Sequence, residues 1–140
     1  MTSNVCVLGA GRMGSSIART LLDRGYPTWV WNRTAAKCDP LAALGAKVAP
    51  SVEDRIRAAD VVIINVLDYA ASDALLKRVG IASALAGKAV VQLTSGSPRL
   101  AREEARLGGS AWCRVSGRSD HGHSGLYRQI RDRTALFGFP

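Results

Sequence analysis

The sequence predicts an α/β fold in which a parallel sheet carries helices on both faces, that is, a doubly wound sheet. Segments typical of strands alternate with segments typical of helices over residues 5–107. Such alternation requires right-handed crossovers between parallel strands. The strand segments are apolar at successive positions, as expected for strands buried on both faces. The chain has 140 residues, of which 47% are hydrophobic, so it can form one domain with a core.

Five strands are expected. Val5–Leu8 is a continuous apolar run, and Thr28–Trp31 is rich in β-branched and aromatic residues. A short third strand is expected at residues 47–49, a clear fourth at 61–66 and a fifth at 88–93. No sixth strand is recognised, so the sheet is expected to be incomplete at its C-terminal end.

Five helices are expected, at residues 15–24, 35–44, 51–59, 71–79 and 98–107. Gly25 and Gly45 follow the first two, where a residue that ends a helix is needed. Ser51 is expected to cap the third helix, whose first turn is acidic. Pro40 interrupts the second pattern early, and Pro98 suits the first turn of the last helix.

A glycine-rich motif joins the first strand to the first helix. Residues 9–14, Gly-Ala-Gly-Arg-Met-Gly, have the spacing G-x-G-x-x-G. Gly9 permits the tight turn, Gly11 lets the backbone approach a phosphate, and Gly14 allows close packing of helix on strand. The helix N-terminus adds free N–H groups and a positive dipole end. The motif alone is also compatible with a plain tight turn, but the flanking strand and helix favour a Rossmann-like dinucleotide site.

Four polar or glycine-rich loops follow strand ends, at residues 9–14, 32–34, 67–69 and 94–97. Ligands of such sheets bind beyond the carboxyl ends of the strands, so these loops are expected to converge on one crevice. An NAD site usually has an acidic residue after the second strand. Asn32, Arg33 and Thr34 stand there instead, with Lys37 just beyond. Because a guanidinium pairs with a 2′-phosphate, the sequence predicts NADP(H) rather than NAD(H).

The composition argues against several other classes of function. The net charge is +8, but no run of five like charges occurs and aromatic residues are only 6%, so specific nucleic-acid binding is not expected. The sequence has no apolar run of membrane-spanning length and no recognisable signal peptide. Its three cysteines are scattered without a C-x-x-C pair, which favours a reducing, cytoplasmic location and predicts neither a disulfide frame nor a metal site.

These segments together resemble the N-terminal domain of the 6-phosphogluconate dehydrogenase and β-hydroxyacid dehydrogenase superfamily. The resemblance covers about residues 4–112. It rests on the glycine motif, Trp31-Asn32-Arg33-Thr34, residues 60–63 and residues 93–98. The last segment, Leu-Thr-Ser-Gly-Ser-Pro, is most similar to imine reductases. The resemblance implies an NADP-binding domain.

The resemblance also implies roles for individual residues. Ser95 and Gly96 would border the substrate. Structural alternatives stay open: Met13 as a packing residue, Asp68 as the start of a helix and Ser97 as an N-cap. The implied cofactor-binding set is Gly9, Gly11, Arg12, Met13, Gly14, Asn32, Arg33, Thr34, Lys37, Val66, Leu67 and Thr94.

The strand–helix alternation stops at about residue 112, so we expect a cofactor domain over residues 1–112 and an irregular basic tail over residues 113–140. A metal site at His121-Gly122-His123 lacks a pattern of further ligands. A flexible basic tail is a second interpretation. A third hypothesis is a frameshift between about residues 105 and 113, because a back-translation advanced by one nucleotide can spell an imine-reductase-like continuation.

Two functions follow as expectations. The first is the cofactor domain of an oxidoreductase that transfers hydride between NADPH and a small C=N or C=O substrate. No residue matches the family's catalytic proton donor, which is expected in a helical second domain that also forms the homodimer of the full-length family. A homodimer of this chain alone is not expected. The alternative is a stand-alone NADPH-binding module without catalysis.

Overall fold

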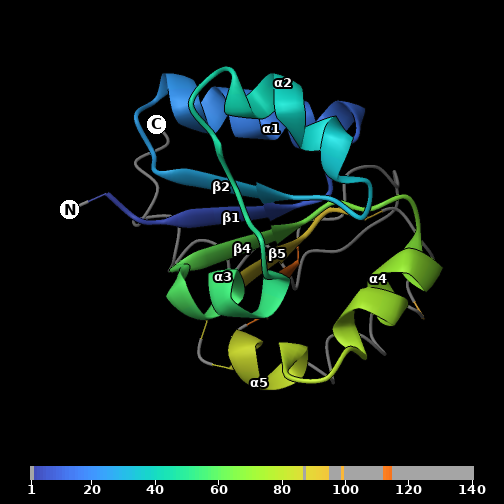
Figure 1. Ribbon diagram of the computed structural model, residues 1–140. Helices are drawn as coiled ribbons and strands as arrows, with labels where there is room; N and C mark the ends of the chain where they lie inside the picture. The colour runs from blue at the N-terminus through green and yellow to red at the C-terminus, as the bar shows by residue number, and fades with distance from the viewer. Residues whose placement is uncertain (1, 87, 95–98, 100–111, 115–140) are drawn as a thin grey trace, which may run out of the picture.

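The computed structural model describes residues 2–86, 88–94, 99 and 112–114, and within them a single sheet forms the centre of the molecule (Figure 1). Its strand order is β3-β2-β1-β4-β5-β6. Every neighbouring pair is parallel, so the predicted doubly wound α/β fold is confirmed. The strands are β1 Val5–Leu8, β2 Thr28–Trp31, β3 Lys47–Val48, β4 Val61–Ile64, β5 Ala89–Gln92 and β6 Trp112–Arg114.

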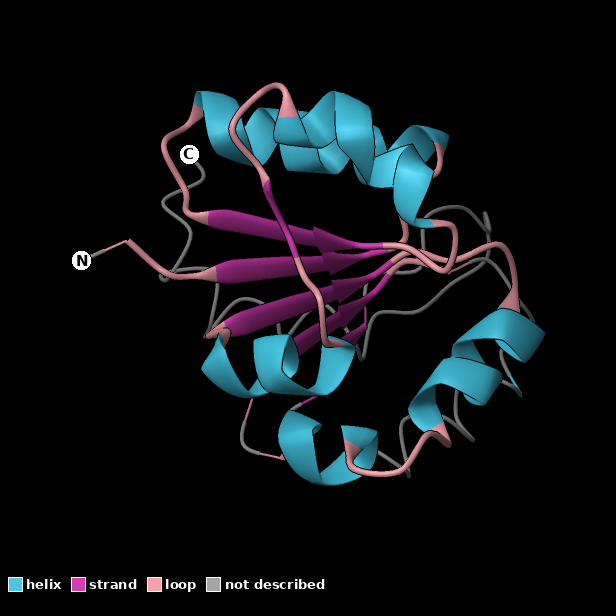
Figure 2. Ribbon diagram, viewed as in Figure 1, coloured by secondary structure: helices cyan, strands magenta, loops and turns pink. Residues whose placement is uncertain are grey.

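Helices cover both faces of the sheet (Figure 2). The first two α-helices lie on one face, and the third and fifth lie on the other (Figure 1). In the described part of the chain, no helix has the length and apolar character needed to cross a membrane. The helices are α1 Arg12–Asp23, the 3-10 helix η1 Ala35–Cys38, α2 Asp39–Ala42, α3 Val52–Ala58, α4 Tyr69–Leu76 and α5 Ile81–Leu85.

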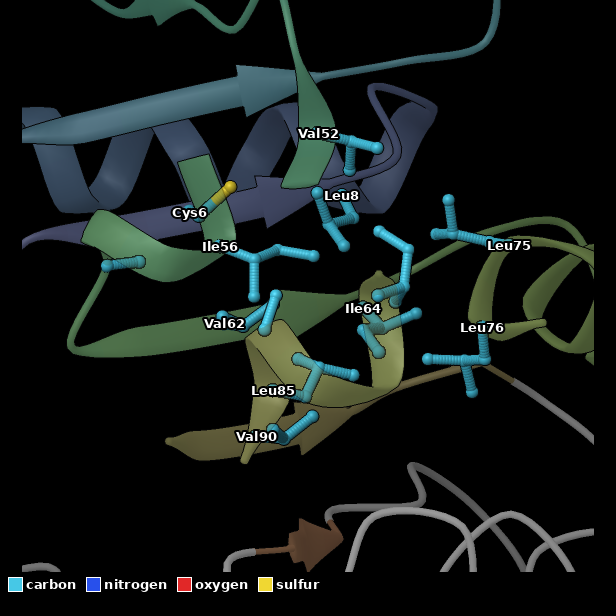
Figure 3. Packing of buried hydrophobic residues seen from close by; sticks show 13 residues of the cluster. Cys6, Leu8, Val52, Ile56, Val62, Ile64, Leu75, Leu76, Leu85 and Val90 are labelled. Carbon is cyan, nitrogen blue, oxygen red and sulfur yellow. The ribbon is translucent and has the colours of Figure 1, made fainter. Parts of the chain in front are cut away.

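The core has two layers because alternate residues of a strand point to opposite faces. On β1, Val5 and Val7 belong to the layer under α1 and α2. Cys6 and Leu8 belong to the layer under α3, α4 and α5 (Figure 3). All four side chains are buried. A strand buried on both faces needs apolar residues throughout, which explains why Val5–Leu8 shows no polar alternation.

Element bounds differ from the sequence prediction where local signals compete. α1 begins at Arg12, inside the glycine motif, with Gly11 as its N-cap. The expected helix over residues 35–44 is split into η1 and α2, and Pro40 lies in the first turn of α2, because proline lacks the N–H that a continuing helix would use. Ser51 caps α3 as predicted, since its side chain accepts a hydrogen bond from the Asp54 N–H.

Two elements were missed. The short α5 follows the turn at Gly80. β6 pairs with β5 through Val90↔Trp112, Val91↔Cys113 and Gln92↔Arg114, so the sheet has the sixth strand that the sequence did not reveal and runs past the boundary expected at residue 112. Two expected segments lie outside the described residues: the helix at residues 98–107, apart from Arg99, and the tail from residue 115 with the His121–His123 pair. The frameshift hypothesis is therefore not tested by the structure.

Two glycines permit the close approach of β1, β4 and α1. A Cβ on Gly9 would lie 2.0 Å from the backbone oxygen of Asn65, and Gly9 has a φ of +108°. A Cβ on Gly14 would lie 1.9 Å from the backbone oxygen of Gly9. Apart from the residues next to Gly11, no atom in the described part of the chain lies within 4 Å of a Cβ added there. The predicted close packing at Gly14 and the tight turn at Gly9 are therefore present. No contact with the described chain requires a glycine at position 11.

We expect Gly9→Ala and Gly14→Ala to lower the free energy of unfolding by about 3 kcal/mol or more, because backbone atoms would have to shift. Gly11→Ala should lower it by at most about 1 kcal/mol, the cost of a poorer N-cap. Urea unfolding followed by circular dichroism measures all three. Equal losses at the three positions would contradict this packing.

Alkaline stability should depend on Cys6. Burial raises the pKa of its thiol from the ordinary value of 9.0 to about 12, against a smaller opposing effect of Arg55. Between pH 9 and 12 the unfolded chain loses this proton while the folded chain keeps it, so the free energy of unfolding falls as pH rises. Cys6→Ala should reduce that fall in urea titrations at about pH 8 and about pH 10.5. An identical fall in both proteins would refute the assignment.

Candidate cofactor-binding cleft

A cleft of about 810 Å³ lies beyond the carboxyl ends of β1, β2 and β4. Its walls come from the glycine-rich loop, the segment after β2, the β3–α3 connection, the turn after β4 and α4. This is the crevice at which the strand order reverses, between β1 and β4, and where ligands of such sheets bind. Its lining residues are Gly9, Gly11, Arg12, Met13, Trp31, Asn32, Arg33, Thr34, Ala35, Lys37, Cys38, Val48, Ala49, Pro50, Asn65, Val66, Leu67, Ala71, Ala74, Leu75 and Arg78.

The first turn of α1 opens into this cleft. Gly11 is the N-cap with φ −75° and ψ −169°, and no side chain caps the helix. Gly11, Arg12 and Met13 line the cleft and are exposed. The first turn contains no acidic residue, so its N–H groups and the positive end of the dipole suit an anion. The chemistry of this donor set fits a pyrophosphate.

Asn32 ties two walls of the cleft together. Its Oδ1 accepts a hydrogen bond from the Ala10 N–H at 3.0 Å, and its Nδ2 donates to the backbone oxygen of Thr34 at 3.0 Å. The Gly9 N–H also donates to the backbone oxygen of Trp31 at 2.8 Å. The amide of Asn32 thus holds the glycine loop against the end of β2, a positioning role that the sequence did not distinguish from the expected phosphate contact.

The charges that line the cleft are positive. Arg12, Arg33 and Lys37 are exposed at its wall, and Arg78 lines its far side. Among the described lining residues there is no Asp or Glu. A site of this composition attracts a polyanion and would repel no phosphate group.

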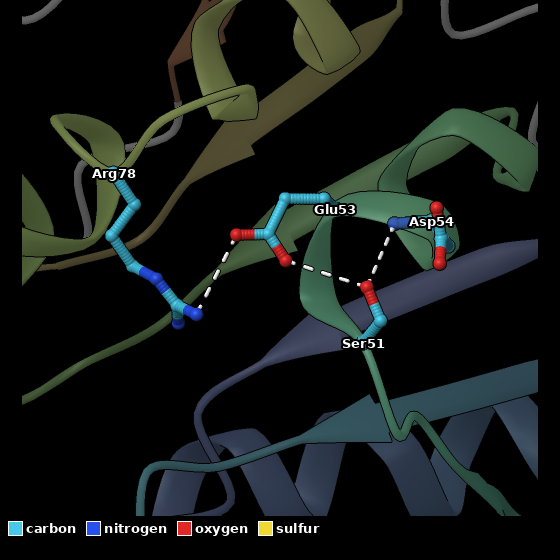
Figure 4. Close-up of polar contacts among 4 residues, drawn as sticks. All are labelled: Ser51, Glu53, Asp54 and Arg78. Carbon is cyan, nitrogen blue, oxygen red and sulfur yellow. Dashed lines mark hydrogen bonds and ion pairs between the residues drawn. The ribbon is translucent and has the colours of Figure 1, made fainter.

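Arg78 closes one side of the cleft and is held from behind. Its guanidinium lies 3.5 Å from the Glu53 carboxylate. Glu53 in turn accepts a hydrogen bond of 3.4 Å from the Ser51 hydroxyl, which caps α3 at the Asp54 N–H (Figure 4). The guanidinium carbon also lies 5.7 Å from the ring centre of Trp31. These contacts link the end of α4 to α3 and to the end of β2.

The turn after β4 supplies Val66 and Leu67 to the cleft, as expected. Asp68 caps α4 by accepting the Ala71 N–H at 2.8 Å, which confirms its structural alternative. Thr94 is buried, at 1% exposure, and is not among the described lining residues. Its hydroxyl instead accepts the Val66 N–H at 3.3 Å. Thr94 therefore touches the cleft wall from behind.

The expected site residues divide into three groups. Gly14 and Thr94 lie behind the lining, and Ser95 and Gly96, with Ser97, lie outside the described residues. Asn65 also lines the cleft and was not predicted to do so. Its signal in the sequence is that it is a polar residue within an apolar strand segment. The residues brought together in the lining as expected are Gly9, Gly11, Arg12, Met13, Asn32, Arg33, Thr34, Lys37, Val66 and Leu67.

The thiols of Cys6 and Cys38 are both buried, and burial raises the pKa of each, which disfavours the reactive thiolate form. Cys38 lines the cleft wall but is buried. Burial raises the pKa of its thiol, nearby Asp39 raises it further, and a hydrogen bond from the Asn32 backbone opposes both. Cys6 and Cys38 are both free. Among the described residues, no group of three or more His, Cys, Asp or Glu side chains is placed to hold a metal ion.

Solved structures of imine reductases in complex with a dinucleotide are similar to this chain. An imine reductase from Myxococcus stipitatus in complex with NADP+ superposes with a TM-score of 0.79 and 40% identity, over 95% of this chain and 52% of that one. Its V8 variant in complex with NAD+ superposes with a TM-score of 0.81 and 36% identity, over 97% of this chain and 52% of that one.

Sequence comparison also finds relatives among NADPH-dependent enzymes. The NADPH-dependent reductive aminase of Aspergillus oryzae is 39% identical over 106 residues, which are 75% of this chain and 35% of that protein. The chain thus spans between about a third and a half of these relatives. Residues 4–111 match the family model described as the NAD binding domain of 6-phosphogluconate dehydrogenase. With its doubly wound sheet and basic cleft, the chain belongs to this family of NAD-binding domains.

Proposed function

We propose that this domain binds NADP(H) in the cleft, in preference to NAD(H). The proposal rests on the composition of the cleft lining. The N-terminus of α1 has no side-chain cap, Arg33 and Lys37 line the wall after β2, and none of the described lining residues is acidic. A 2′-phosphate on the ribose would be repelled by a carboxylate at that place and attracted by a guanidinium.

The proposed arrangement uses each wall for one part of the cofactor. The N–H groups of the first turn of α1 bind the pyrophosphate, and Arg12 adds a positive charge there. Arg33, Thr34 and Lys37 bind the 2′-phosphate, with Asn32 positioning their loop. The apolar wall of α4, which includes Ala71 and Ala74, provides a surface for the adenine ring.

The bound cofactor would supply hydride to a small C=N or C=O substrate. This part of the proposal is supported by the relatives named as an imine reductase and a reductive aminase. The chain's own residues would bind and orient the cofactor, whereas the proton donor, much of the substrate pocket and the homodimer interface would belong to a second domain. The cytoplasmic location stays a prediction from cysteine usage.

A stand-alone NADPH-binding module is the alternative. One observation favours it: the described residues form the cleft without any further domain. The two functions differ in catalysis. Because the proton donor is assigned to a second domain, binding without turnover by this chain alone is expected of both functions. NADPH oxidation with a cyclic imine by this chain fused to the C-terminal domain of an imine reductase would support the reductase, and cofactor binding without turnover in that folded fusion would favour the module.

We expect Arg33→Ala to weaken NADPH binding about tenfold or more, because a charge-assisted hydrogen bond to the 2′-phosphate is lost. NADH binding should change little, since NADH lacks that phosphate. Arg19→Ala is the matched control, because Arg19 is exposed on α1 and lies outside the described lining. Fluorescence titration with both cofactors measures the effect. Equal weakening of NADPH and NADH would contradict the 2′-phosphate assignment.

A further inference from the structure

A chain of buried polar groups runs behind the cleft. Gln92 at the end of β5 is 1% exposed, and Ser72 on α4 is fully buried. The Gln92 Nε2 donates to the Ser72 hydroxyl at 2.8 Å, and its Oε1 accepts the Thr94 N–H at 3.1 Å. The Thr94 hydroxyl then accepts the Val66 N–H at 3.3 Å. One side-chain amide thus connects α4, the end of β5 and the turn after β4.

This connection begins where the backbone ladder of the sheet ends. The Asn65 N–H still donates to the backbone oxygen of Leu8 at 2.9 Å, and the Leu93 N–H donates to that of Ile64 at 2.8 Å. The next N–H, that of Val66, is bound by a side chain instead. The position of the turn after β4 is therefore set by the Thr94 hydroxyl, and the backbone of Thr94 is set by Gln92.

Both segments held in this way face the cleft from their other side. Val66 and Leu67 line it from the turn, and Ala71, Ala74 and Leu75 line it from α4. Ser72 stands between Ala71 and Ala74 in the sequence of α4 and is buried. An apolar side chain at position 92 could fill the same space but could not fix both segments, because hydrogen bonds are directional and dispersion contacts are not.

We propose that Gln92 is a positioning residue for the cofactor: through Ser72 and Thr94 its amide holds α4 and the turn at Val66 in the geometry that cofactor binding requires. The inference rests on the proposed function, because it takes NADP(H) as the ligand of the cleft. Gln92 acts through its neighbours and is not among the described lining residues.

The test uses NADPH affinity and thermal stability, measured on the same variants. Gln92→Met removes the amide at similar length, and Thr94→Val removes the hydroxyl that accepts the Val66 N–H. Thr28→Val is the matched control, because Thr28 is likewise a buried threonine, at 3% exposure, whose hydroxyl donates to the backbone oxygen of Tyr26 at 2.9 Å. Thr28 begins β2 and so lies at the amino ends of the strands, whereas the cleft lies beyond their carboxyl ends.

Affinities are measured at a temperature at which each variant is folded, so that lost stability alone cannot change them. Gln92→Met and Thr94→Val are expected to weaken NADPH binding about tenfold, whereas Thr28→Val is expected to lower Tm without changing the affinity. Unchanged affinity in folded Gln92→Met would overturn this inference and leave the proposed function standing. Absence of NADPH binding by the unaltered chain would overturn both.

Discussion

The close approach of β1, β4 and α1 around Gly9 fixes where the N-terminus of α1 lies relative to the sheet. Because Gly9 has no Cβ, the backbone oxygen of Asn65 can lie where a side chain of residue 9 would begin. In the same way, the absence of a Cβ at Gly14 leaves room for the backbone oxygen of Gly9. That approach aims the first turn of α1 at the end of the sheet, where the strand order reverses. Larger residues at either position would move the helix N-terminus away from the crevice.

The walls of the crevice are held by polar side chains that lie in its lining or behind it. Asn32 joins the glycine loop to the end of β2, and Gln92 joins α4 to the turn after β4 through Ser72 and Thr94. The ion pair of Arg78 with Glu53 links α4 to α3. Buried, hydrogen-bonded polar groups such as Gln92 and Ser72 fix geometry in a way that apolar packing does not, so the lining can stay exposed and cationic while its backbone is fixed.

Much of the fold could be predicted because local signals agreed with the tertiary structure. Val5–Leu8 and Thr28–Trp31 were predicted with the observed bounds, since strands buried on both faces need unbroken apolar or β-branched runs. β6 could not be predicted, because three residues paired only with β5 carry no period of their own. The burial of Thr94 depends on contacts between distant loops, which spacing alone does not reveal.

In the proposed complex the dinucleotide lies across this cleft, with its pyrophosphate on α1 and its 2′-phosphate after β2. Backbone-amide NMR of the chain titrated with NADP+ tests it most directly. We expect the largest shifts at the amides of Gly11, Arg12 and Met13 and at those of Arg33 and Thr34. Saturable shifts centred elsewhere, such as the small pocket beside Trp29, or no shifts at all, would contradict it.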